Sequence, residues 1–198
     1  RKAGFRIHQH TAIMTYLSSL RIQNHYQSIT LLHVATHGFY SPLTGHYTAQ
    51  RSFEEQALSR SGLFLSGAAA SLNMKKIPED IEDGILTAKE LSKLDLSNLN
   101  LAILSACQTG LGEIVGDGVF GLQRGFKKAG AQTLLMSLWK VDDTATQLLM
   151  AEFYKNLVSG QNKRAAFLNA QKYLRSYQNG IYDKPEYWAA FIMLDGIH

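Results

Sequence analysis

A histidine and the only cysteine of the chain each follow a run of mostly apolar residues. His37 comes directly after LLHVAT at 31–36, and Cys107 comes directly after LAILSA at 101–106. A cysteine becomes an effective nucleophile when a neighbouring imidazole holds it as the thiolate. The oxyanion of the tetrahedral intermediate also needs N–H donors, a role suited to the backbone N–H groups of Gly38 and Cys107. This combination indicates acyl-transfer chemistry, provided that the two segments meet.

The same two residues also have a purely structural interpretation. A free cysteine often behaves as a small buried hydrophobic side chain, and His37 could be an ordinary surface imidazole. Neighbouring parallel strands lie ~4.8 Å apart, so the ends of two strands can meet around one substrate carbonyl, but nothing requires them to do so. The residues alone leave the question open between a nucleophilic pair and two unrelated side chains.

A metal site formed by His33 and His37 is a second arrangement to consider. Four residues along an extended strand span ~13 Å, which is too far for one ion to bind both imidazoles. The intervening VAT segment contains no glutamate that could act as a base. The sequence therefore predicts no metal site and no other cofactor, and it favours a core or supporting role for His33.

Three glycines, Gly116, Gly118 and Gly121, spell the GxGxxG pattern of dinucleotide-binding folds. They stand at the start of a predicted helix, and the acidic pair at 142–143 follows about twenty residues later. In those folds the first glycine lies in the tight turn directly after the strand, whereas here the segment CQTGLGEIVG intervenes. A dinucleotide-binding enzyme is therefore the weaker alternative.

The elements that would position these residues alternate between strands and helices. Apolar, β-branched runs predict strands at 28–36, 61–68, 99–106, 132–141 and 187–194. Periodicity and caps predict helices at 11–26, 86–96, 117–130, 142–160 and 163–180, with 41–60 irregular and carrying at most a short helix. Because the strands are apolar on both faces, we predict an α/β fold: a mostly parallel sheet with helices on both faces. In such folds chemistry collects beyond the carboxyl ends of the strands, where His37 and Cys107 would lie.

Local signals define several helix boundaries. Thr87 and Glu90 have the spacing of a capping box. An aspartate at the start of the 142–160 helix is suited to cap its first turn. Gly130 is expected to end the preceding helix.

Composition limits the classes of protein to consider. A chain of 198 residues with 45% hydrophobic and 18% charged residues is typical of one globular domain. The net charge of +4 comes without a long basic run, so we predict no direct nucleic-acid contact. No apolar run approaches the ~18 residues of a membrane span, so no membrane partner is expected. The single cysteine excludes an internal disulfide and favours a reducing, cytoplasmic location.

Several motifs together resemble those of the CHAT family, caspase-like domains found beside tetratricopeptide repeats, mostly in bacteria. They are HVATHGFY, EDGILTAKEL, LAILSACQTGLGE, YWAAFIMLDG and the long stretch from GDGVFGLQ to KNLVSG. The resemblance runs from about residue 8 to 196. It implies a three-layer caspase-like fold and a cysteine endopeptidase with a histidine–cysteine dyad.

The resemblance also assigns residues. The histidine of ATHG is His37, the cysteine of SACQTG is Cys107, and Gly38 matches the oxyanion glycine. The segment SLWKVDD matches a loop that helps line the pocket for the residue before the cut. Its expected substrate-binding residues are therefore Trp139, Asp142 and Asp143.

These aspartates have competing interpretations. Asp142 is better explained as a helix cap. For Asp143 the pocket role is slightly favoured, and a buried carboxylate there would select a basic side chain before the scissile bond.

Two features depart from the family pattern. The further strands that commonly come first are absent before Arg1, and GDG carries Asp where Glu is more frequent. We therefore expect residues 1–198 to be a single CHAT protease domain that lacks the N-terminal portion. Either another chain supplies the missing part, in which case Arg1 could mark a processing site, or the domain is a shortened one.

The combined expectation is hydrolysis of protein or peptide substrates through a thioester on Cys107, with His37 as acid and base. A tetratricopeptide-repeat region or a regulatory subunit is the expected regulatory partner. The main alternative is a CHAT-like interaction module without catalytic activity.

Overall fold

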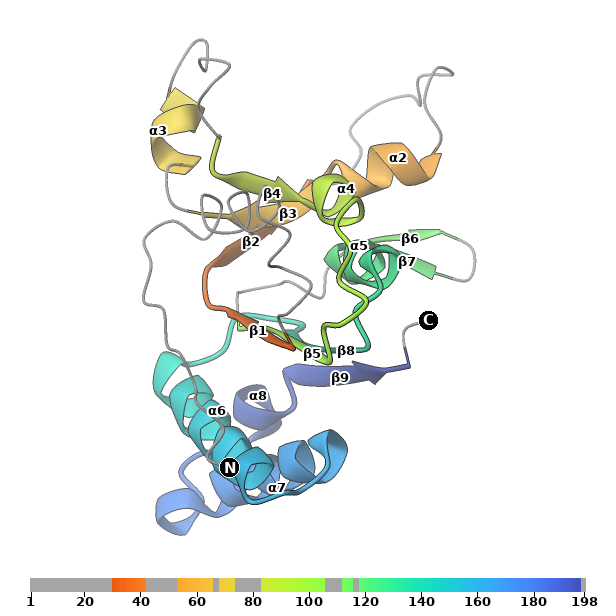
Figure 1. The fold of residues 1–198 in the computed structure, drawn as a ribbon. Helices are drawn as coiled ribbons and strands as arrows, with labels where there is room; N and C mark the ends of the chain where they lie inside the picture. The colour runs from red at the N-terminus through yellow and green to blue at the C-terminus, as the bar shows by residue number, and fades with distance from the viewer. Residues whose placement is uncertain are drawn as a thin grey trace.

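A computed structural model of the chain, drawn in Figure 1, describes residues 30–41, 53–65, 68–73, 83–105, 112–115 and 118–196. The helix predicted at 11–26 lies outside these ranges. In the described part, no helix is long and apolar enough to cross a bilayer.

A four-stranded sheet forms the centre of the fold (Figure 1). Its strands are β1 (Leu31–Val34), β5 (Leu101–Leu104), β8 (Thr133–Ser137) and β9 (Phe191–Asp195), in the order β1-β5-β8-β9. The first three strands are parallel, and β9 runs antiparallel to β8. The predicted α/β fold with a mostly parallel sheet is therefore confirmed.

Helices cover both faces of this sheet. On one face lie α6 (Asp143–Val158), α7 (Lys163–Ser176), the short 3-10 turn η2 (Tyr177–Asn179) and α8 (Pro185–Trp188), and on the other lie α4 (Ala88–Leu91) and α5 (Leu122–Ala129). Alternate strand residues face opposite layers, as on β8, where Leu134 packs toward α4 and α5 and Leu135 toward α6 and α7. Both side chains are fully buried. This arrangement confirms the predicted three-layer, caspase-like architecture.

A second, antiparallel sheet packs on the same side of the central sheet as α4 and α5 (Figure 1). It contains β2 (His37–Tyr40), β3 (Ser61–Phe64) and β4 (Ile85–Thr87), in the order β2-β3-β4. Only its middle strand was predicted, and β3 ends at Phe64 because the short helix α3 (Ala68–Asn73) follows. The outer strands, β2 and β4, are too short to be identified from an alternation of apolar residues. They are defined by their backbone pairing with β3. The short helix expected within 41–60 is α2 (Phe53–Leu58).

The predicted caps are present. Thr87 and Glu90 form the capping box of α4, although this helix is much shorter than 86–96. The Asp142 carboxylate accepts a hydrogen bond from the Ala145 N–H at 2.9 Å and so caps α6. Gly130 ends α5 with a φ of 94°, a left-handed conformation that favours glycine.

The predicted starts of α5 and β9 are also wrong. Residues 118–121 are not helical, because β6 (Gly112–Val115) and β7 (Gly118–Gly121) form an antiparallel hairpin directly before α5. The strand predicted at 187–194 begins only at Phe191, because α8 occupies the residues before it. Pro185 stands at the first position of α8, where the fixed φ of proline favours helix initiation.

Candidate active site

Two neighbouring parallel strands, β1 and β5, lead toward the residues predicted to do chemistry. Val34, the last residue of β1, is paired with Leu104, the last residue of β5. The Ser105 N–H donates to the Val34 carbonyl at 3.1 Å, so the pairing continues one residue beyond the strands. His37 follows Val34 by three residues, and Cys107 follows Leu104 by three. Cys107 itself lies outside the described residues.

His37, which the sequence placed just beyond the first strand, is the first residue of β2. It is exposed, and its backbone is paired with Phe64 of β3. The Thr36 hydroxyl donates to the Phe64 carbonyl and ties the chain to β3 directly before the histidine. Gly38 is half-buried opposite Leu63. The second sheet therefore determines where His37 and the Gly38 N–H lie.

His33 forms a hydrogen-bonded network behind the edge of the central sheet. Its Nε2 lies 2.8 Å from the Ser105 hydroxyl, and its Nδ1 lies 2.7 Å from the Tyr154 hydroxyl on α6. We call these three residues the His33 network. These contacts agree with the expectation that His33 is a core or supporting histidine. Sequence reasoning missed Tyr154, because no local pattern distinguishes it from its aromatic neighbour Phe153 on α6.

Burial controls protonation within the His33 network. Desolvation lowers the pKa of His33 below its ordinary value of 6.5, because the charged imidazolium is disfavoured away from water. The same cause raises the pKa of Tyr154 to about 12. At neutral pH the imidazole is therefore uncharged, and one ring nitrogen donates while the other accepts.

The geometry does not support a metal site at these histidines. Both ring nitrogens of His33 already contact hydroxyl groups, and His37 lies on a strand of the other sheet. Among the described residues, no group of three His, Cys, Asp or Glu side chains is arranged to bind an ion.

The loop after β8 carries the three residues expected to bind substrate. Trp139 is 38% exposed, and its indole N–H donates to the Glu186 carbonyl at 3.2 Å. The carboxylate of Asp142 is used in capping α6, which confirms the interpretation favoured for it. Asp143 is exposed in the first turn of that helix, so its carboxylate is not the buried group that would select most strongly for a basic side chain.

The GxGxxG glycines do not form a nucleotide-binding turn. Gly118 begins β7, and Gly121 is both the last residue of β7 and the N-cap of α5. In a dinucleotide site the pattern would span the turn between a strand and its helix. Gly116 lies outside the described residues. The strand placement of the other two glycines argues against the dinucleotide-binding alternative.

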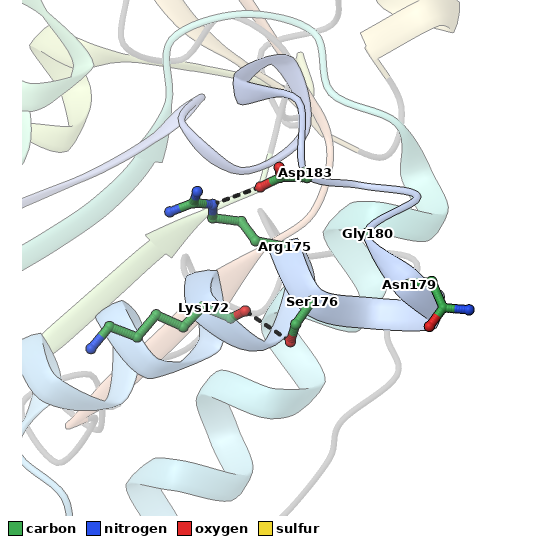
Figure 2. A pocket seen from close by; sticks show the side chains of 6 residues that line it. All are labelled: Lys172, Arg175, Ser176, Asn179, Gly180 and Asp183. Carbon is green, nitrogen blue, oxygen red and sulfur yellow. Dashed lines mark hydrogen bonds and ion pairs between the residues drawn. The ribbon is translucent and has the colours of Figure 1, made fainter.

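A surface hollow at the carboxyl end of α7 lies apart from these residues (Figure 2). Its lining residues are Lys172, Arg175, Ser176, Asn179, Gly180 and Asp183. Arg175 pairs with Asp183 at 3.0 Å and its guanidinium also lies 4.7 Å from the Trp188 ring centre. The Ser176 hydroxyl donates to the Lys172 carbonyl. These contacts stabilise the end of α7, and the lining contains neither histidine nor cysteine.

Residues 8–196 match the profile of the CHAT domain. The chain belongs to the CHAT domain family. This family is related to caspase-like peptidases, in agreement with the three-layer fold. The match over residues 8–196 confirms the resemblance to the CHAT family that the sequence motifs indicated.

Two curated relatives of this CHAT domain chain are mammalian. Tetratricopeptide repeat protein 28 of Mus musculus is 34% identical over 110 residues, and its Homo sapiens counterpart is 32% identical over 114 residues. The alignments cover 56% and 58% of this chain but 4% of each relative. The names of these relatives agree with the expected association between CHAT domains and tetratricopeptide repeats. A bacterial origin stays a prediction.

Proposed function

We propose that this CHAT domain is a cysteine endopeptidase with Cys107 as nucleophile and His37 as general acid and base. The observation that carries the proposal is the pairing of β1 with β5. Their last residues are in register, and the same number of residues separates each strand from its reactive side chain. Three residues span at most about 11 Å, so both side chains start from one edge of the sheet.

The proposed reaction proceeds through a thioester. The Cys107 thiolate attacks the carbonyl carbon of the scissile peptide, and a C–S bond forms. The C–N bond then breaks, and the leaving amine takes a proton from His37. Water, deprotonated by His37, attacks the thioester and releases a carboxylate and the regenerated thiol. The N–H groups of Gly38 and Cys107 would stabilise the oxyanion, at about 3 kcal/mol per donor in comparable sites.

Substitution of the dyad tests this proposal. In Cys107→Ala, cleavage of protein substrates should disappear, and in His37→Ala it should fall by at least about a hundredfold. His37→Ala should keep the wild-type thermal unfolding midpoint, since His37 is exposed, and Cys107→Ala should remain folded. A search for new peptide termini in a proteome treated with wild type or with Cys107→Ala measures the effect without a known substrate. Equal cleavage by both proteins would overturn the proposal, and no cleavage by the wild type with its repeat partner would favour the inactive interaction module.

The loop after β8 is proposed to contact the residue before the cut, with Trp139 and Asp143 as contacts. Because Asp143 is exposed, its charge should contribute only a modest preference for a basic side chain. A panel of fluorogenic peptides with Arg, Lys, Asp and Leu at this position measures it. We expect Arg and Lys to be preferred several-fold, and Asp143→Asn to reduce that preference. A preference for Asp would contradict this assignment.

Because the curated relatives are named for tetratricopeptide repeats, we propose that such a region or a regulatory subunit controls this domain. Protein or peptide substrates are the proposed partners at the site itself.

A further inference from the structure

The His33 network is unusual for the layer in which it lies. The neighbouring side chains on this face of β1 and β5 are apolar, with Leu31, Leu101 and Ile103 packed against α6 and α7. A hydrogen bond adds only about 1 kcal/mol of net stability, because the unfolded chain bonds to water instead. Apolar side chains of similar volume would stabilise this layer about as well. A polar network here therefore calls for a role other than stability.

The network joins three segments that are far apart in the chain. His33 is 72 residues from Ser105 and 121 residues from Tyr154. β1 leads to His37, β5 leads to Cys107, and α6 begins directly after the loop that carries Trp139. The hydrogen bonds therefore connect β1, the residue after β5 and α6, which are the three segments next to those that carry the proposed active-site residues.

Hydrogen bonds define relative positions more sharply than apolar contacts do, because they require particular distances and directions. Ser105 follows β5 directly, and both its backbone N–H and its hydroxyl are bonded toward β1. Cys107 is two residues further on, a span of at most about 7 Å. A shift of Ser105 would therefore displace the proposed nucleophile relative to His37.

We propose that His33, Ser105 and Tyr154 are positioning residues that set the location of Cys107 relative to His37. This inference rests on the proposed endopeptidase function. The His33 imidazole bridges the Tyr154 hydroxyl on α6 and the Ser105 hydroxyl after β5. The direction in which the chain leaves β5 therefore depends on the position of α6. None of the three residues touches the substrate in this account.

The test uses variants that remove one hydroxyl each. Tyr154→Phe keeps the ring of α6 in place, and Ser105→Ala removes the second partner of His33. Ser105→Thr restores a hydroxyl at the same position. Tyr173→Phe on α7 is the matched control, because Tyr173 is 38% exposed and outside the network. All assays are done well below each unfolding midpoint, which separates positioning from loss of the fold.

Two readouts are measured on the purified protein. The first is kcat and KM for a cleaved peptide. The second is the pH dependence of iodoacetamide alkylation at Cys107, followed by mass spectrometry of the peptide that contains it. Cys107 is the only cysteine of the 198-residue chain, so this peptide reports on one thiol. Alkylation needs no substrate, and its pH midpoint reports how well an imidazole stabilises the thiolate.

In Tyr154→Phe and Ser105→Ala we expect kcat to fall about tenfold or more with KM changed less than about twofold, as for a small misplacement of a reacting group. The alkylation midpoint should move toward the ~8.5 of an unperturbed thiol. Ser105→Thr should recover most of the activity, and Tyr173→Phe should match the wild type. Network variants that match the wild type in both readouts, or a control that changes equally, would overturn the positioning role alone. A wild-type thiol that titrates near ~8.5 and cleaves nothing would overturn both proposals together.

Discussion

His33 and His37 are separated by three residues and lie in very different surroundings. His33 is half-buried between two hydroxyl groups, whereas His37 is exposed on the edge strand of another sheet. An imidazole that transfers protons to a substrate must be accessible, and one that orients its neighbours must be enclosed. The surroundings therefore separate the two roles more clearly than the residue type does.

Protonation of His33 should affect stability in acid. Because its pKa in the folded protein lies below the unfolded value of 6.5, the unfolded chain binds more protons between the two values. The stabilisation from neutral His33 is fully present above pH 6.5 and is lost as the pH falls through the lower folded-state pKa. Tyr154, with its pKa of about 12, stays protonated throughout this range.

Urea unfolding of the wild type and of His33→Gln between pH 7.5 and 4.5 measures this contribution. The free energy of unfolding should decline less steeply with acid in His33→Gln, because glutamine does not titrate. Parallel declines in the two proteins would contradict the assignment of this effect to His33.

At the scale of elements, the second sheet links the fold to the proposed dyad. Within the described part of the chain, β2 is paired only with β3. The rings of Phe39 on β2 and Phe64 on β3 stack with their centroids 4.7 Å apart. Gly62 of β3 is the cross-strand partner of Phe39, and the backbone of β3 is also paired with β4. The position of His37 therefore depends on close packing within this small sheet.

Gly62→Ala tests that dependence. A Cβ at this position would lie 2.6 Å from the Leu86 carbonyl oxygen and 2.7 Å from the Phe39 ring. The backbone of β4 cannot yield as a flexible side chain would, so we expect a destabilisation of about 1–3 kcal/mol. Peptide cleavage should also fall, even well below the unfolding midpoint, because β2 shifts.

Ser61→Ala in the same strand is the control. Ser61 is buried, and among the described residues its hydroxyl has no hydrogen-bond partner. Removing this hydroxyl should therefore leave both stability and cleavage nearly unchanged. Wild-type stability in Gly62→Ala would show that β3 and β4 are less closely packed than the structure indicates.

At the scale of the whole molecule, the central sheet separates two hydrophobic clusters. One packs between this sheet and α4 and α5, and the other packs between it and α6 and α7. Because every strand contributes residues to both clusters by simple alternation, neither layer can separate without exposing the sheet. The described part should therefore unfold as one cooperative unit.

Two adjacent leucines of β8 test this expectation. Leu134 and Leu135 are both fully buried but face opposite clusters. Leu134→Ala and Leu135→Ala should each cost about 2–5 kcal/mol in urea unfolding, through lost burial and a residual cavity. Val158→Ala, at a position that is 68% exposed, should change stability by less than about 0.5 kcal/mol. A two-step transition, or a small cost at one leucine alone, would indicate separately folding layers.

The sequence by itself determined the features whose causes lie within a few residues. The apolar runs predict β1, β5 and β8, and the capping side chains Thr87 and Asp142 mark the starts of α4 and α6. These signals are local because a strand's pattern or a helix cap involves neighbours in the chain. The motifs around His37 and Cys107 likewise carried the family resemblance.

Only the tertiary structure decided which distant segments meet. The pairing of β2 with β3, the reversal of β9 and the bridge from His33 to Tyr154 join residues across long stretches of chain. Such contacts depend on how whole layers pack, since a strand of four residues or one tyrosine on a helix has no distinctive local pattern. The same packing excluded GxGxxG as a strand-to-helix turn, because Gly118 and Gly121 became part of a hairpin strand.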